Sequence, residues 1–143
     1  MQIAQDLGLY AIVRPSPFIC AEWEFGGLPA WLLTEDMRIR SSDPRFIEAV
    51  AAYYDELLPR LTPRLLDRGG NILMMQVENE YGSYGEDKAY LRAVRDLMIE
   101  RGVTCPLFTS DGPWRATLEA GTLIDEDLSV SYTHLRAHET VLD

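Results

Sequence analysis

Two carboxylates and an amide follow a short, mostly apolar run in the middle of the chain. The run covers residues 72–77, and Glu78, Asn79 and Glu80 come directly after it. Apolar runs of this length, bounded by turn residues, predict strands that are buried on both faces. Parallel α/β enzymes carry their chemistry at the carboxyl ends of such strands. This stretch is therefore the predicted centre of a functional site.

Glu80 is the leading candidate for a proton-transfer residue. A carboxylic acid beside aromatic side chains such as Tyr81 can keep its proton near neutral pH and donate it to a substrate. The alternative is a solvated carboxylate at the rim of the domain. The local sequence supports both interpretations equally.

Glu78 and Asn79 have different predicted roles. Glu78 shares a strand face with Glu80 but lies one layer deeper, so we expect a structural carboxylate that needs a cationic partner. Arg14, at the end of the neighbouring predicted strand, is the candidate partner. Asn79 interrupts the apolar alternation, which predicts a bend, and its amide can hold a substrate hydroxyl or satisfy a turn.

A polar and aromatic loop at residues 14–31 contains the second group of candidate residues. Glu22 is adjacent to Trp23, and a carboxylate beside an indole is typical of sugar sites, where the acid binds hydroxyls and the ring covers the apolar sugar face. The alternative for Trp23 and Trp31 is packing within the loop. Glu24 fits a sugar ligand or a rim charge.

The elements around these residues alternate. Apolar runs at 9–13, 71–77 and 103–109 predict three strands. Helical spacing from Phe46 to Leu61, after a cap at Ser42 or Asp43, predicts one helical segment that ends at Gly69-Gly70. Spacing from Tyr90 to Met98, after the cap Asp87, predicts a second helix that ends at Gly102; both lie between successive strands. Two prolines, Pro59 and Pro63, are expected to kink or split the first of these helices.

This order predicts an α/β fold with parallel strands and right-handed crossovers. All three strand-end loops then lie on one face of the sheet: residues 14–31, 78–85 and 110–114. Asp111 belongs to the third loop, where the Asp-Gly-Pro sequence explains it as a turn residue.

Composition excludes several classes of function. The chain has 143 residues, enough for one domain, and a formal net charge of -10, which argues against nucleic acid or an anionic membrane as partner. No apolar run is long enough to span a bilayer. Cys20 and Cys105 are far apart and read as isolated packing residues. We expect the natural N-terminus to be missing, so no compartment is predicted.

The character of the sequence changes after Leu128. We predict one partial domain at 1–128 and a non-native or disordered tail at 129–143. The tail contains both histidines, His134 and His138, whose spacing suits a helix face that binds metal. No third ligand accompanies them, so a metal site is disfavoured.

Two long motifs resemble one family. Residues 14–32 (RPSPFICAEWEFGGLPAWL) and 76–84 (QVENEYGSY) are closely similar to glycoside hydrolase family 35, the β-galactosidases, and residues 40–44 and 107–112 match it too. The resemblance covers about residues 1–128.

The resemblance implies a TIM (β/α)8 barrel, here present as about strands 3 to 5, that releases terminal β-linked galactose with retention. It implies that Glu80 is the acid/base, that Asn79 and Glu22 bind galactose hydroxyls, and that Cys20 and Ala21 contribute backbone contacts. The nucleophile on strand 7 is then outside this chain. No metal or cofactor is needed, the partner is a β-galactoside, and the oligomeric state is not predicted.

Three alternatives remain at this stage. The first is another retaining barrel glycosidase with a different sugar. The second is a carbohydrate-binding partial barrel without catalysis. The third is a truncation product without function. In every case we expect the 143-residue chain alone to be inactive and poorly stable, because its barrel cannot close.

Overall fold

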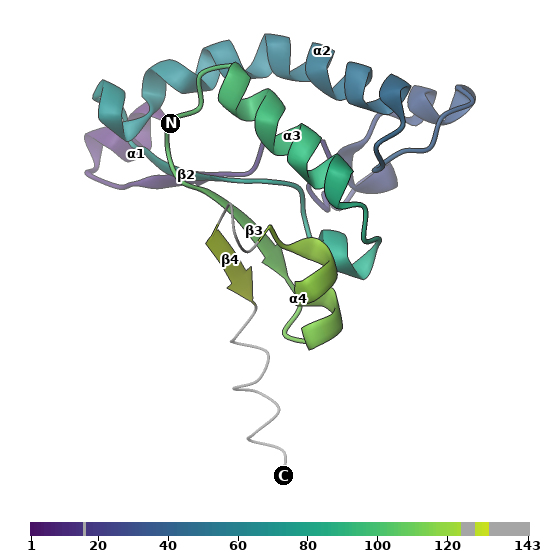
Figure 1. The fold of residues 1–143 in the computed structure, drawn as a ribbon. Coiled ribbons are helices and arrows are strands. Elements are labelled where there is room, and N and C mark those ends of the chain that lie inside the picture. Colours follow the sequence, from purple (N-terminus) through teal and green to yellow (C-terminus); the bar gives the residue numbers. More distant parts are fainter. Residues whose placement is uncertain (16, 124–127, 132–143) are drawn as a thin grey trace.

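The computed structural model describes residues 1–15, 17–123 and 128–131 (Figure 1). Helices and strands alternate along this part of the chain. The elements are α1 (Gln2–Asp6), β1 (Ala11–Val13), α2 (Pro44–Leu61), β2 (Ile72–Gln76), α3 (Lys88–Glu100), β3 (Leu107–Asp111), α4 (Arg115–Gly121) and β4 (Leu128–Ser131). Short 3-10 turns lie between them: Glu24–Gly27, Ala30–Thr34, Thr62–Arg64, Leu66–Arg68 and Tyr81–Ser83.

The four strands form one parallel sheet in the order β1-β2-β3-β4. Met75 of β2 is the register partner of Val13 in β1 and of Leu107 in β3. Helices α2, α3 and α4 are the crossovers, as parallel neighbours require. The predicted α/β architecture with parallel strands is therefore confirmed.

The fourth strand, β4, was not predicted. It pairs with β3 and runs across the expected boundary after Leu128, so Ser129–Ser131 continue the sheet. The sequence there, Leu-Ser-Val-Ser, is too short and too polar to register as an apolar run. His134 and His138 lie outside the described residues.

The third strand lies later in the chain than predicted. It begins at Leu107, not at residue 103, and it ends at Asp111, not at residue 109. Pro106 precedes it and has no N–H to donate to a ladder, although its carbonyl accepts a bond from the Met75 amide at 3.1 Å. The shift matters because it makes Asp111 the last residue of the strand.

Both long helices begin at their predicted caps. Asp43 accepts a bond from the Arg45 amide at 3.0 Å, and Asp87 accepts one from the Tyr90 amide at 3.0 Å. Pro59 does not split the helical segment, because α2 runs through it and ends at Leu61. The split comes only afterwards, where a 3-10 turn contains Pro63.

The core lies between the sheet and the two long helices. Figure 1 shows α2 and α3 together over one face of the sheet. The fully buried side chains of these helices are Phe46, Tyr54, Leu58, Tyr90, Leu91, Val94 and Met98. The opposite face is open at β1, where Ile12 is 58% exposed. This one-sided core holds the carboxyl ends of β2 and β3 in a fixed position, and the candidate site is built there.

Candidate functional site

The turn after β2, residues 78–84, presents Glu80 through an unusual backbone. Glu80 adopts left-handed angles (φ 46°, ψ 42°), and Glu78 also has a positive φ of 59°. The Glu80 amide donates to the Ser110 carbonyl at 3.0 Å, and the Glu80 carbonyl accepts from the Ser83 amide at 3.0 Å. We call residues 78–84 the acid turn.

The side chain of Glu80 is half-buried, and its carboxylate forms no hydrogen bond or ion pair with another described residue. Left-handed geometry is sparsely populated by residues other than glycine, and such strain clusters at functional sites. The arrangement therefore leaves the carboxylate available to a ligand while its backbone is held.

Glu78 has the predicted structural role but not the predicted partner. It is 1% exposed, and its two oxygens accept bonds from Arg40 Nε at 2.9 Å and Nη2 at 2.8 Å. The Tyr90 hydroxyl donates to the same carboxylate at 2.8 Å. Burial, followed by the charge of Glu78, holds the pKa of Tyr90 well above its usual value, so this hydroxyl remains a donor. The expected pair between Glu78 and Arg14 was wrong.

Arg40 replaces Arg14 because the segment before α2 folds back over the acid turn. The guanidinium lies 3.7 Å from the ring centroid of Phe18 and 4.2 Å from that of Tyr84. It also donates to the Asn79 carbonyl at 2.9 Å. Sequence reasoning missed Arg40, since strand order pointed only to residues at neighbouring strand ends.

Asn79 is buried and held on several sides. Its amide donates to Glu78 Oε2 at 2.5 Å, and its side-chain oxygen accepts from Arg14 Nη2 and, at 3.4 Å, from Gln76 Nε2. The side-chain nitrogen, Nδ2, donates to no other described residue. This donor is therefore free to bind a ligand hydroxyl, as expected from the amide chemistry.

Arg14 connects the acid turn to the loop that follows β1. It donates to the Ile19 carbonyl at 3.1 Å and to Asn79 Oδ1. Cys20 and Ala21 come next, and Cys20 has a positive φ of 53°. The Ala21 amide donates to the Gly26 carbonyl at 3.1 Å, which closes the loop. The structure thus brings the base of this loop to Asn79.

The tip of the loop is exposed. Trp23 is 81% exposed, and Glu22 is exposed, with no side-chain bond to another described residue. No hydrogen bond within the described part of the chain joins Glu22 or Trp23 to Glu80. Their predicted sugar contacts stay a prediction.

Asp111 belongs to the site, although the sequence suggested a simple turn residue. Its Oδ1 accepts from the Gly82 amide of the acid turn at 2.7 Å. Burial raises the pKa of Asp111 to about 6; the Gly82 bond and the charge of Lys88 oppose this, and the charges of Glu80 and Glu78 add to it. Its place at a strand end on the same face was the signal available in the sequence.

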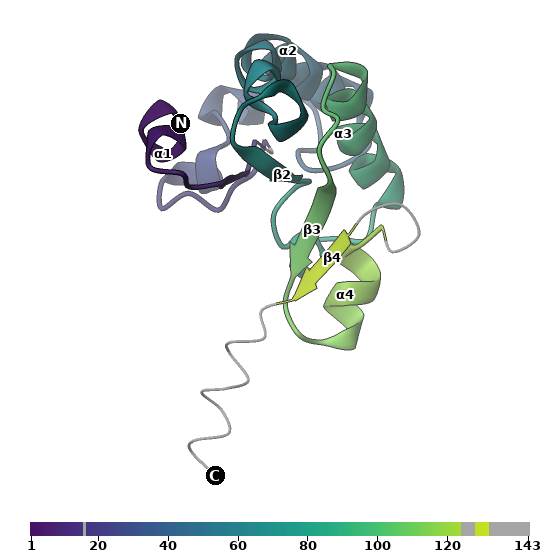
Figure 2. The same cartoon turned by 90° about the vertical axis from the view of Figure 1, so that its left-hand side faces the viewer.

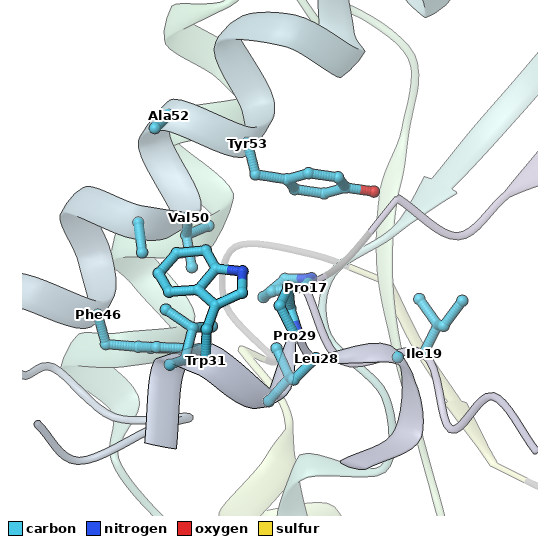
Figure 3. A pocket seen from close by; sticks show the side chains of 12 residues that line it. Pro17, Ile19, Leu28, Pro29, Trp31, Phe46, Val50, Ala52 and Tyr53 are labelled. Atoms are coloured by element: carbon cyan, nitrogen blue, oxygen red, sulfur yellow. The ribbon is translucent and has the colours of Figure 1, made fainter. Parts of the chain in front are cut away.

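An apolar pocket of the described structure lies elsewhere. It has a volume of about 320 Å³ and lies between the loop after β1 and helix α2 (Figure 3). Its lining is apolar and contains no carboxylate: Pro17, Ile19, Gly27, Leu28, Pro29, Trp31, Leu32, Phe46, Ala49, Val50, Ala52 and Tyr53. It is therefore separate from the acid turn.

The described residues lack a metal-binding cluster and a membrane-spanning helix. Residues 1–15, 17–123 and 128–131 contain no group of three or more His, Cys, Asp or Glu side chains that could bind a metal ion. None of the helices in this same part of the chain has the length and apolar character needed to cross a bilayer.

Helices alternate with parallel strands, and acidic side chains gather where the strands end. These features define part of an α/β domain with a parallel sheet, an architecture that many enzymes have. The particular family follows from comparison, because the model of the family described as glycosyl hydrolases family 35 matches residues 1–141. The chain belongs to this family.

Curated relatives agree with this assignment. The chain is 56% identical to "Beta-galactosidase 1" of Dictyostelium discoideum over 96 residues, which cover 66% of the chain and 14% of that protein. It is 47% identical to "Beta-galactosidase" of Mus musculus over 135 residues, or 92% of the chain and 21% of that protein. It is 47% identical to "Beta-galactosidase-1-like protein 2" of Homo sapiens over 110 residues, which cover 76% of the chain and 17% of that protein. The chain thus spans about a fifth or less of these relatives.

Proposed function

We propose that this chain carries the acid/base half of a β-galactosidase active site and acts within a longer enzyme. The observation that carries the proposal is the acid turn. Glu80 presents an unpaired carboxylate at a strand end, and Asn79 next to it keeps a free amide donor. The printed names of the relatives support galactosides as substrates.

In the proposed enzyme, the sheet is part of a (β/α)8 barrel. We assign β1, β2 and β3 to barrel strands 3, 4 and 5, with β4 as the next strand. Active sites of such barrels lie at the carboxyl ends of the strands, which is where the acid turn is found. The open face at Ile12 fits this assignment, because the inner face of a barrel sheet is covered only when the barrel closes.

The proposed reaction proceeds in two steps with retention of configuration. Glu80 gives its proton to the glycosidic oxygen as the bond from that oxygen to the anomeric carbon breaks. A second carboxylate, which we place outside this chain, forms a bond to the anomeric carbon at the same time. Glu80 then takes a proton from water as the water oxygen bonds to the anomeric carbon and the bond between that carbon and the second carboxylate breaks, which releases galactose and the free carboxylate. Retention requires the two carboxyl groups to be about 5–5.5 Å apart.

The ligand contacts follow the same assignment. The Nδ2 donor of Asn79 and the carboxylate of Glu22 bind galactose hydroxyls, and the backbone at Cys20 and Ala21 lines the sugar. No metal or cofactor takes part in these steps. The 143-residue chain alone is expected to be inactive, because it supplies only one carboxylate of the pair.

The test uses the full-length protein that contains this chain and its Glu80→Ala variant. Wild type should hydrolyse aryl β-galactosides and not aryl β-glucosides. The variant should lose about 10²-fold or more on phenyl galactoside. Added azide should accelerate its turnover of dinitrophenyl galactoside, whose leaving group needs no acid, and give β-galactosyl azide. Full activity in the variant, or an inverted azide product, would contradict the proposal.

A second candidate is carbohydrate binding without catalysis. It is favoured by the exposed Trp23 beside Glu22, since an exposed indole next to an acid suits a sugar face. This candidate predicts galactose binding without turnover in the full-length protein. Binding should then be lost with Trp23→Ala and kept with Glu80→Gln, which isothermal titration would measure.

A further inference from the structure

The last two residues of β3 hold the acid turn at two points. The Ser110 carbonyl accepts the Glu80 amide at 3.0 Å, and Asp111 Oδ1 accepts the Gly82 amide at 2.7 Å. The two bonds lie on either side of Tyr81, so they determine the direction in which the turn leaves Glu80. The first bond is made by the backbone, while the second depends on the side chain of Asp111.

The carboxylate of Asp111 is enclosed. The residue is 1% exposed and ends β3, and helix α4 lies beside this strand (Figure 2). The approach is so close that a Cβ on Gly121 would lie 2.2 Å from Oδ1 and 2.4 Å from Oδ2. Gly82 is equally confined, since a Cβ there would lie 1.9 Å from the Thr117 carbonyl oxygen. The turn, Asp111 and α4 therefore form one rigid contact.

The charges around Asp111 do not form an ion pair with it. Lys88 of α3 donates instead to the carbonyls of Glu119 and Thr122, at 2.6 and 2.5 Å. Glu78 and Glu80 contribute like charges from the acid turn. Oδ2 has no hydrogen-bond partner within the described ranges. A buried acid of this kind costs stability, so its contribution is geometric.

We propose that Asp111 is a positioning residue for proton transfer by Glu80. By holding the Gly82 amide, Asp111 keeps the acid turn in the left-handed course that points the Glu80 carboxyl group at the departing oxygen. This inference rests on the proposed function of Glu80. It predicts that loss of Asp111 impairs acid catalysis selectively and leaves the binding of the sugar and the attack of the nucleophile largely intact.

Leaving groups distinguish this role from a general structural one. Dinitrophenolate leaves without protonation, whereas the departure of phenolate or of a sugar alkoxide depends on the acid. A misplaced Glu80 therefore lowers kcat/KM for phenyl galactoside and spares kcat/KM for dinitrophenyl galactoside, because kcat/KM reports only the steps up to the departure of the leaving group. A variant that is merely less folded loses both activities in the same proportion.

The experiment measures kcat and KM for both substrates in full-length wild type, Asp111→Ala, Asp111→Asn and the surface control Asp96→Ala. We expect Asp111→Ala to raise the ratio of dinitrophenyl to phenyl kcat/KM by about 10-fold or more, because small displacements of a catalytic group have effects of this order. Asp111→Asn keeps a neutral acceptor for Gly82, so its ratio should rise by about 2- to 5-fold. The control ratio should equal that of wild type.

Each outcome decides the matter. A raised ratio with kcat/KM for dinitrophenyl galactoside within about twofold of wild type supports the positioning role. A ratio equal to wild type in both Asp111 variants overturns it, and if Asp111→Ala does not fold, Asp111→Asn decides alone. Wild type that hydrolyses neither substrate overturns the proposed function itself. The remaining outcome is an active wild type in which Glu80→Ala raises the ratio but the Asp111 variants do not. That outcome overturns only this inference.

Discussion

The acid turn and the loop after β1 carry comparable residues but are held very differently. In the acid turn, Glu78 and Asn79 are buried and each is fixed by several hydrogen bonds. In the loop, the side chains of Glu22 and Trp23 face solvent, and Arg14 ties the loop base to Asn79. The difference indicates that the acid turn is preorganised within this chain, whereas the side chains at the loop tip are not.

The largest effect on this comparison should come from Arg40→Met. The substitution leaves Glu78 buried without its cation, and breaking a buried pair in this way costs about 3–5 kcal/mol. Urea unfolding of the full-length protein would measure the loss. Arg60→Met is the matched control, because its ion pair with Glu56 is exposed and should contribute less than about 1 kcal/mol. Equal costs for the two variants would show that the acid turn is not held by Arg40.

A smaller effect should come from pH acting on Asp111. Its pKa is raised from 3.8 to about 6 in the folded state, so the folded protein binds this proton more tightly than the unfolded chain does. Stability should then fall as pH rises from about 4 to above 6, by about 3 °C in melting temperature relative to Asp111→Asn, which does not titrate. Calorimetric scans of both proteins across this range would measure the difference. A constant difference at every pH would show that Asp111 titrates normally.

The smallest effect on stability should come from Trp23→Ala in the loop. Because the Trp23 side chain is 81% exposed, the substitution should change the free energy of unfolding by less than about 0.5 kcal/mol. The same variant should raise KM for galactosides if the loop closes on the sugar. Its counterpart Tyr90→Phe, in the buried network of Glu78, should cost about 1–3 kcal/mol instead. Similar costs for both would remove the contrast between the regions.

Sequence reasoning succeeded where the signal was local. The run at 72–77 and the caps Asp43 and Asp87 were placed within one or two residues, because burial period and capping chemistry act over a few positions. The same local signal placed Asn79 and Glu80 just beyond the end of β2, while their roles stay a prediction.

The errors came from long-range contacts. Arg40 reaches Glu78 across 38 residues, and Asp111 reaches Gly82 across 29. Neither distance leaves a periodic trace in the sequence, and each contact depends on how a loop folds back over a strand end. Strand β4 was missed for another reason, because its pairing with β3 is made by the backbone and its composition is polar.

The left-handed backbone at Glu80 has a consequence for how this position can change over time. A side chain at φ 46° is strained, and glycine would relax it. Selection for stability alone would therefore favour replacement of Glu80 by glycine. Only selection for turnover retains the carboxylate. The left-handed backbone also disfavours branched or bulky residues at this position. A lineage that keeps an acid here therefore keeps it for an activity that is still in use.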